Sequence, residues 1–285
     1  MDYLELDLHH PFLTQMLPYD EMPERLFVRG ALPERRTYHR TIAMVGSRRC
    51  TKYGETVAYE TAYKLAQMGF IIVSGLAYGI DACAHRGCLD AGGTTIAVLG
   101  TPIDQIYPRS NLSLAKQILE RGAIVSEYAP GAPVYAQNFV YRNRIVVGLA
   151  DATIIVEASL QSGTMSTASY TLAQNKDVYV VPGDITRPMS AGCLKLLKDG
   201  AMFYTEPLDL MHGLNVQPCD IKAEQYRNLS SDEQLLVSTI KSGHSASEDI
   251  IKFAEIPPAK LATLTTMLEL KNIIKSVGNS EWALV

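Results

Sequence analysis

Short runs of β-branched and other apolar residues recur along the chain from about residue 41, and this recurrence constrains the fold more than any other feature. Most runs show little alternation with polar residues, which is typical of parallel strands covered by helices on both faces. Each run is followed by a glycine-containing turn and a helix-like stretch, as at Gly46, Gly75 and Gly100. The pattern predicts an open, doubly wound and mostly parallel α/β sheet. The runs are Thr41–Val45, Ile71–Ser74, Thr94–Leu99, Ile124–Glu127, Thr153–Glu157 and Val178–Val181, with Ala201–Tyr204 as a further candidate strand.

The chain divides into four predicted parts. Residues 1–40 are too short for a domain and carry four prolines, so we expect an arm or a short helix packed on the main body. Residues 41–212 hold the Rossmann-like sheet. Residues 213–228 contain Asn, Pro and Gly and are predicted to be a linker. Residues 229–285 predict three helices, the first capped by Ser231, and then a hairpin, which is a winged-helix-like pattern.

Composition alone does not indicate a nucleic-acid partner. The 285 residues carry a formal net charge of −4, whereas nucleic-acid binders usually have a basic excess. The five cysteines include no C-x-x-C pair and have no histidines at ligand spacing, which predicts no metal site. No apolar run reaches the roughly 18 residues of a membrane-spanning helix. The acidic N-terminus differs from a secretory signal, so we expect a cytoplasmic protein.

Glycine and arginine residues gather in the turns that follow the predicted strands. In parallel α/β sheets these turns meet at one edge, where free amide groups and helix N-termini attract anions. The first turn holds Gly46, Ser47 and Arg48, and Gly75 opens the second. Glycine lets the backbone approach a ligand closely, and arginine forms bidentate phosphate contacts. A glycine turn with solvated arginines is an equally good interpretation of the first turn taken alone.

Later turns add cationic, polar and aromatic candidates. Arg109 precedes a predicted helix start, where a cation opposes the helix dipole and an anionic ligand would offset it. Arg142 and Arg144 cannot share one helix face, so we expect one to point into the cleft while the other braces the sheet. Core packing is an equal alternative for each aromatic ring in these loops. The remaining candidates are Asn143, the anion-binding turn Ser162, Gly163 and Thr164, and Phe139 as a stacking platform for a base.

A series of ordered motifs runs from about Pro23 to Leu208. The motifs are Val45-Gly46-Ser47-Arg48, Ser74–Asp81 with Ala84-His85, Thr95–Gly100, Asp104 with Tyr107-Pro108, Ser126-Glu127-Tyr128, Arg142–Ile145, Val156–Ala158, Ser162–Thr164 and Val181-Pro182-Gly183. In these motifs the chain resembles the DprA/Smf family of DNA-processing proteins.

The resemblance implies a function and a set of site residues. Members are dimeric proteins that bind and protect incoming single-stranded DNA in natural transformation and promote loading of the RecA recombinase, without ATP or metal. By motif position, Ser47, Arg48 and Arg109 are implied to bind the strand, and the 162–164 turn to line the same pocket. The chain is expected to lack the N-terminal helical domain of many members, and its tail is similar to the winged-helix domain of others.

Two alternatives remain beside this interpretation. LOG-like phosphoribohydrolases or nucleotide sensors share an arginine helix and a Gly-Thr turn, but the hydrolases need a carboxylate just after that turn. Here Met165, Ser166 and Thr167 follow, and losing a general acid–base group removes about 10²–10⁴-fold in rate, so no catalytic residue is predicted. The second alternative is an interaction module, with Leu194, Leu197 and Phe203 as the predicted dimer surface and core packing as the competing explanation.

Overall fold

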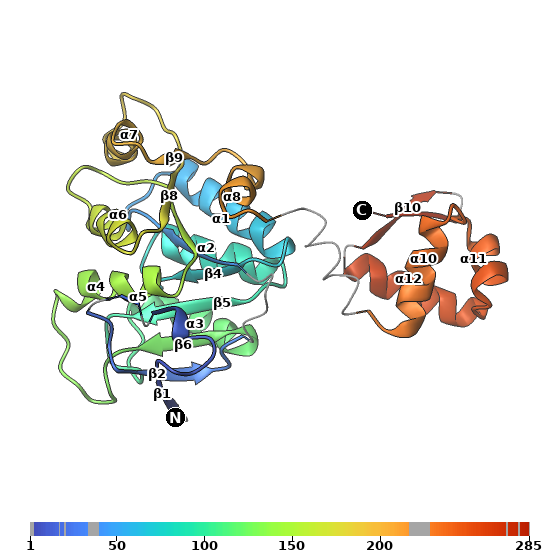
Figure 1. Cartoon of the computed structure of the whole chain (residues 1–285), viewed down its shortest axis with the longest axis horizontal. Helices are drawn as coiled ribbons and strands as arrows, with labels where there is room; N and C mark the ends of the chain where they lie inside the picture. Colours follow the sequence, from blue (N-terminus) through green and yellow to red (C-terminus); the bar gives the residue numbers. More distant parts are fainter. Residues whose placement is uncertain are drawn as a thin grey trace. The chain divides into compact units, whose positions relative to one another are not determined.

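The computed structural model describes residues 3–16, 18–19, 21–33, 40–216, 229–271, 273–278 and 280–284. The chain forms two compact units, Met1–Gln217 and Pro218–Val285, each of which has its own secondary structure (Figure 1). The predicted linker 213–228 lies outside the described residues beyond Val216.

The described residues of the first unit form a nine-stranded sheet in the order β1-β2-β6-β5-β4-β3-β7-β8-β9. The chain winds from β3 outward to β6 and then returns to β7 on the other side of β3, so the sheet is doubly wound, as predicted. The pairs from β6 to β9 are parallel, whereas β2 pairs antiparallel with both β1 and β6. The strands are β1 (Leu4–Asp7), β2 (Arg25–Gly30), β3 (Thr41–Val45), β4 (Ile71–Ser74), β5 (Thr95–Leu99), β6 (Ala123–Ser126), β7 (Ala152–Ile155), β8 (Asp177–Val180) and β9 (Met202–Phe203).

Every apolar run singled out in the sequence contains a strand, within one or two residues at its ends. Residues 1–40 behave differently from the expected arm or short helix, because they contribute β1 and β2 to the sheet. Strand β2 joins the sheet through the buried residues Leu26, Phe27 and Val28, and Val28 pairs with Val125 of β6. Its pairing extends the sheet beyond β6 with an antiparallel strand.

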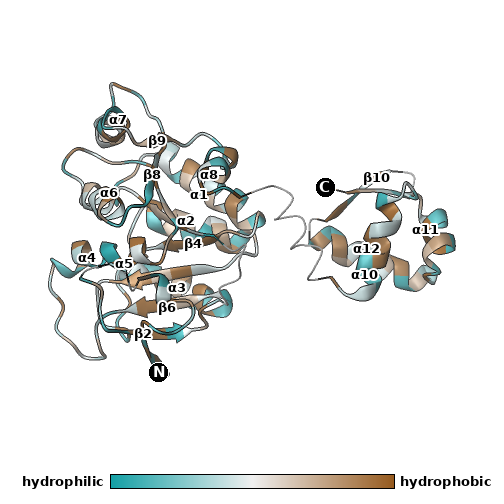
Figure 2. Cartoon of the chain, viewed as in Figure 1, coloured by the Kyte–Doolittle hydropathy of each residue, from teal (hydrophilic) through white to brown (hydrophobic). Residues whose placement is uncertain are grey.

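Helices cover both faces of this sheet. On one face Phe27, Leu99 and Ile124 pack against helices α2 and α3, and on the other Val45 and Val125 pack with residues of α5, α6 and α7. Figure 2 shows the resulting hydrophobic strands between helices with mixed surfaces. The helices are α1 (Lys52–Gln67), α2 (Ile80–Asp90), α3 (Leu112–Arg121), α4 (Asn138–Tyr141), α5 (Asn143–Gly148), α6 (Gly163–Ala173), α7 (Ala191–Lys198) and α8 (Pro207–Gly213), with short 3-10 turns η1 (Thr14–Met16), η2 (Arg109–Asn111) and η3 (Pro188–Ser190).

The second unit has the predicted order of three helices followed by a hairpin. Its own core includes Leu236, Ile250 and Leu268. The first helix is capped by Ser230 rather than Ser231, in a reciprocal capping box with Glu233. The elements are α10 (Ser231–Lys241), α11 (Ser247–Ala254), α12 (Pro258–Leu270), β10 (Ile274–Gly278) and β11 (Glu281–Leu284).

Candidate nucleic-acid interface

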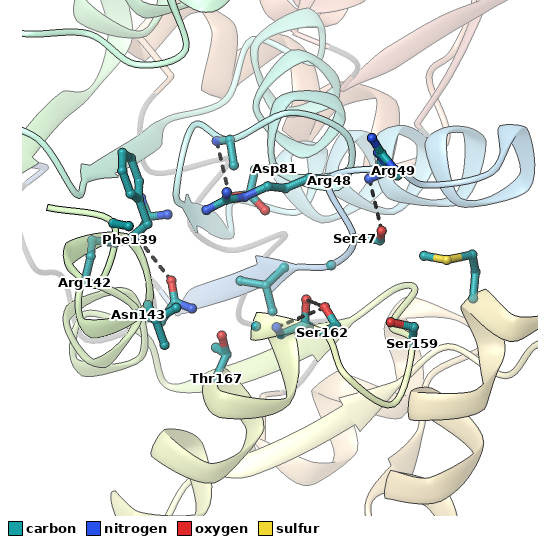
Figure 3. A pocket seen from close by; sticks show the side chains of 18 residues that line it. Ser47, Arg48, Arg49, Asp81, Phe139, Arg142, Asn143, Ser159, Ser162 and Thr167 are labelled. Atoms are coloured by element: carbon teal, nitrogen blue, oxygen red, sulfur yellow. Dashed lines mark hydrogen bonds between the residues drawn. The ribbon is translucent and has the colours of Figure 1, made fainter.

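A pocket of about 550 Å³ opens at the carboxyl ends of β3 and β7. These neighbouring strands belong to the two halves of the doubly wound sheet, so the pocket lies at the topological switch point, where open α/β sheets bind ligands. Its walls come from the turn after β3, from α4 and α5, and from the start of α6 (Figure 3). Of the candidates from the sequence, the pocket brings together Gly46, Ser47, Arg48, Phe139, Arg142, Asn143, Ser162, Gly163 and Thr164.

The turn after β3 is held tightly against the start of α2. The Ser47 amide donates to the backbone oxygen of Glu157 over 2.8 Å, and the Ser47 oxygen accepts from the Ile80 amide over 3.3 Å. A Cβ atom on Gly46 would meet the Ile80 side chain at 2.6 Å, so only glycine permits this approach. The turn therefore presents the Arg48 side chain from a fixed backbone.

Arg48 is exposed and has no ion pair with any other described residue. Its Cζ atom lies 5.5 Å from the centre of the Phe139 ring. The Tyr107 ring packs on the same ring, with 5.1 Å between centroids, and is itself half exposed. An unpaired guanidinium beside two accessible rings is suited to a phosphate next to a stacked base.

The prediction that Arg142 binds the nucleic acid needs correction, because its guanidinium is buried and not free to contact a phosphate. Its Nη1 donates to the backbone oxygens of Gly75, over 2.6 Å, and of Val98, and its Nε donates to Oδ1 of Asn143 over 3.1 Å. Burial, with a smaller contribution from Arg48, lowers the pKa of Arg142 to about 10, against the opposing effect of Asp81. Arg142 therefore shapes the pocket wall and fixes Asn143.

Asp81 is the carboxylate of this pocket and was not a candidate from the sequence. Its Oδ2 accepts from the amides of Gly75 and Ala77 over 3.1 and 3.4 Å. Burial raises the pKa of Asp81, and the charge of Arg142 and the two amides oppose that rise. The carboxylate is thus occupied in holding the second turn.

Asn143 and Thr167 offer polar atoms to the pocket. The Nε–H of Arg142 only donates, so its partner on Asn143 is the oxygen Oδ1 and the Nδ2 amide is left as a donor. Thr167 is buried, yet its hydroxyl has no hydrogen-bond partner among the described residues. Sequence reasoning missed Thr167, although its position one helical turn after Gly163 was a usable signal.

The third wall is the N-terminus of α6. The Ser162 hydroxyl caps this helix by accepting from the Thr164 amide over 3.1 Å, and it donates to the Thr164 hydroxyl over 2.9 Å. The positive end of the helix dipole therefore faces the pocket. Together with Arg48 and Arg49, it gives the pocket a local positive field on a chain of net negative charge.

Gly75 and Arg109 are the two candidates that do not line this pocket. Gly75 lies beneath the Arg142 guanidinium. Arg109 lines a separate hollow beside α3, but it follows Tyr107 by two residues, and Tyr107 contacts Phe139. Arg48 thus contacts one ring of the Tyr107–Phe139 pair, and Arg109 follows the other ring by two residues in the chain.

The remaining candidates are distributed between core and surface. Arg144 is buried, pairs with Glu127, and stacks on the Tyr141 ring with Cζ 3.9 Å from its centre, so both arginines of the motif are structural. Of the predicted dimer residues, Leu197 packs against the main core and Leu194 is half-buried, whereas Phe203 on the edge strand β9 is 61% exposed. The apolar stripe of α7 is thus largely core.

Within the described parts of the chain, no group of three or more His, Cys, Asp and Glu residues is placed to hold a metal ion. Among those same residues, no helix has the length and apolar character needed to cross a bilayer.

The chain is similar in sequence to known proteins. A family model described as DNA recombination-mediator protein A matches residues 5–215. Protein Smf of Escherichia coli is 41% identical over 201 residues, which are 70% of this chain and 53% of that protein. DNA processing protein DprA of Streptococcus pneumoniae is 39% identical over 170 residues, 60% of each chain. The chain thus spans little more than half the length of such relatives.

Solved structures share the fold of the first unit. The S. pneumoniae DprA structure superposes with a TM-score of 0.68 at 32% identity, covering 74% of each chain. DprA of Helicobacter pylori, which has a single-stranded DNA binding mode, superposes with a TM-score of 0.66 at 30% identity over 75% of this chain and 96% of that one. From the family match and these similarities, the chain belongs to the DNA recombination-mediator protein A family of DprA and Smf proteins.

Proposed function

We propose that this protein binds single-stranded DNA at the switch-point pocket, with one base inside and the neighbouring phosphate on Arg48. The observation that carries the proposal is the unpaired Arg48 guanidinium over the Phe139 ring at the mouth of a pocket that holds the unpartnered Thr167 hydroxyl. Asn143 Nδ2 and the Thr167 hydroxyl are placed to bond a base edge. The single-stranded DNA binding mode of the H. pylori relative supports this assignment.

The strand continues from the pocket across the Tyr107 ring towards Arg109. Aromatic rings interleaved with cations suit a single strand, because its unpaired bases stack while its phosphates are neutralised. A duplex has its bases already paired and stacked, and the pocket admits only a flipped base. We therefore expect preference for single strands without strong sequence dependence.

A phosphoribohydrolase activity lacks support from the pocket. The residues that follow the Ser162–Thr164 turn are Met165, Ser166 and Thr167, none of which is a carboxylate. The carboxylate that does line the pocket, Asp81, accepts two backbone amides and lies beside Arg142. Because both amides stabilise the ionised carboxylate and commit it to holding the second turn, Asp81 is poorly suited to be a general acid or base.

The wider role is inferred from the family. We propose that the protein protects incoming single strands in the cytoplasm and promotes RecA loading during transformation or recombination. We also propose a homodimer in which the exposed edge strand β9 contributes Phe203 and Met202, 61% and 42% exposed. An edge strand with apolar side chains requires a cover to remain unaggregated. The dimer is supported if the unaltered protein sediments as a dimer and Phe203→Glu sediments as a monomer. If Phe203→Glu sediments as the unaltered protein does, this surface is not the dimer interface.

The DNA-binding proposal is tested by fluorescence anisotropy with labelled oligothymidine and a matched duplex over a range of salt. We expect tighter binding of the single strand, and for Arg48→Ala a log–log salt slope lower by about 0.7, the value for one phosphate contact. Arg48→Lys should retain the slope. If nucleotides raise the melting temperature while oligothymidine does not bind, the nucleotide-sensor alternative is correct instead.

A further inference from the structure

A second hollow, of about 440 Å³, lies along α3 outside the pocket. We call it the α3 groove. Three cationic side chains line it, Arg29, Arg109 and Lys116, with Asp104 as the one carboxylate among its lining residues. The function proposed above uses only Arg109, so the other two cations have no assigned role.

The cations come from three separate elements. Arg29 lies on β2, where it pairs with Ile124 of β6. It lies two residues beyond Phe27, which is buried under α3, and alternate residues of a strand share one face. Lys116 is in the middle of α3, and Arg109 stands at the carboxyl edge of the sheet just before that helix. The groove therefore leads from the edge that carries the pocket along the side of α3.

The cations in the groove are only partly compensated, because Asp104 is the one carboxylate among its lining residues. None of Arg29, Arg109 and Lys116 forms an ion pair with another residue that the structure describes. Asp104 accepts a 3.4 Å hydrogen bond from the Gly131 amide instead. Arg109 and Lys116 are exposed and Arg29 is half-buried. A concave surface with three unpaired cations concentrates positive potential and attracts a polyanion.

We propose that the α3 groove binds the phosphodiester backbone of the same single strand after it leaves the pocket, with Arg29 and Lys116 each neutralising one phosphate. The inference rests on the proposed function and extends its binding surface. The strand is chosen as the occupant because Arg109 belongs to the groove and follows Tyr107, one ring of the Tyr107–Phe139 pair, by two residues in the chain. The apolar side chains Leu112 and Leu119, which also line the groove, contact sugars.

The experiment compares oligothymidines of two lengths, about 4 nucleotides to fill the pocket and about 20 to reach the groove. Binding of the full chain is measured by anisotropy between low and high salt. The double variant Arg29→Ala/Lys116→Ala is expected to lower the salt slope for the long strand by about 1.4, since each single-strand phosphate contact contributes about 0.7. Binding of the short strand should be unchanged, because the pocket residues are untouched.

Two controls accompany this measurement. Lys64→Ala removes an exposed lysine from the last turn of α1, next to the amino end of β4, and should leave both slopes unchanged. Arg29→Lys/Lys116→Arg keeps both charges and should restore the long-strand slope. Thermal unfolding of each variant verifies that the fold is retained, since a misfolded double variant would also lose the short strand.

The outcomes separate this inference from the proposed function. If the unaltered chain binds both strands and the double variant keeps the slope for the long one, the groove is not a strand contact and the pocket assignment stands. The inference is also overturned if the double variant lowers the salt slope for a duplex and not for the long single strand. Failure of the unaltered chain to bind either oligothymidine would overturn the proposed function itself.

Discussion

The guanidinium of Arg142 lies directly over the backbone of Gly75, so that a Cβ atom at position 75 would overlap its Cζ and both terminal nitrogens. The same arginine donates to Gly75 and Val98 and orients the carboxamide of Asn143. Gly75 therefore acts on the pocket through Arg142, although it does not line the pocket itself. The motif glycine and the motif arginine form one structural unit.

Gly75→Ala is expected to destabilise the fold and weaken DNA binding together. The added methyl has no space without moving a buried guanidinium, and overpacking of this kind costs about 1–3 kcal/mol. Urea unfolding monitored by circular dichroism measures the loss. The matched control is Gly163→Ala, where the new Cβ meets only Val140 Cγ2 at 3.9 Å. Equal stability of the two variants would show that the Gly75–Arg142 contact is not constraining.

Phe139→Leu is expected to weaken single-strand binding without changing its salt dependence. A ring that stacks on a base contributes about 1–3 kcal/mol but carries no charge, so the number of released counterions stays the same. Anisotropy titrations at several salt concentrations give both quantities. Tyr63→Leu, whose ring stacks on Tyr59 along α1, should have no effect on binding. A change in slope for Phe139→Leu would mean that it acts by displacing Arg48.

The parallel strands, and the edge of the sheet at which the pocket lies, could be predicted from the sequence because both follow from local patterns. Apolar runs such as Ile71–Ser74 have few partners other than neighbouring strands, and the turns after parallel strands must meet at one edge. The antiparallel β2 was missed, since its pairing with β6 depends on a contact about 100 residues away along the chain. Long-range pairing of this kind leaves no periodic signal at either partner.

The roles of individual arginines could not be predicted in the same way. Arg48 follows β3, whereas Arg142 and Arg144 lie at the start of α5 just before β7, and only Arg48 of the three is exposed. What separates them is the presence of acceptors in the fold: Val98 and Gly75 oxygens for Arg142, and Glu127 for Arg144. Those acceptors are 17 to 67 residues distant in sequence, so the distinction requires the tertiary structure.

His85 makes the stability of the fold depend on pH. The Thr95 hydroxyl donates its only hydrogen to the Ile72 backbone oxygen over 2.7 Å. It must therefore accept in its second hydrogen bond, which joins it to His85 Nδ1 over 2.7 Å. The neutral His85 ring thus carries its proton on Nδ1. Nε2 is buried without a hydrogen-bond partner among the described residues. Burial, assisted by the charge of Arg142, lowers the pKa of His85 to about 3.

We therefore expect the free energy of unfolding to fall as the pH is lowered from about 6.5 to about 3. In this window the unfolded chain binds a proton at His85 that the folded protein excludes, at about 1.4 kcal/mol for each pH unit. His85→Asn keeps a donor for Thr95 and should flatten this dependence. The comparison also separates the effect of His85 from that of Asp81. The raised pKa of Asp81 makes the free energy of unfolding rise, not fall, as the pH is lowered. His9→Asn, at an exposed position, is the control and should leave the pH dependence of the free energy of unfolding as it is in the unaltered protein. If that pH dependence persists in His85→Asn, another group is responsible for it.

Removing the second unit is expected to leave single-strand affinity unchanged within about twofold. Residues 229–285 contain five lysines, no arginine and seven acidic residues, so their net charge of −2 offers no electrostatic gain to DNA binding. Both lysines at the ends of α12 are engaged: Lys260 pairs with Asp232 over 2.7 Å and Lys271 with Glu233 over 2.6 Å.

A chain ending at Val216 keeps the core residues that pack on each face of the sheet and should unfold with the transition assigned to that unit in the full protein. Its affinity and salt slope for oligothymidine are compared with those of the full chain and of Lys260→Ala/Lys271→Ala. Equal slopes in all three are expected, because none of the phosphate contacts proposed for the strand comes from α12. A lower slope in both altered chains would instead identify α12 as a DNA-contacting helix, whose exposed side chains include Met267 and Leu270.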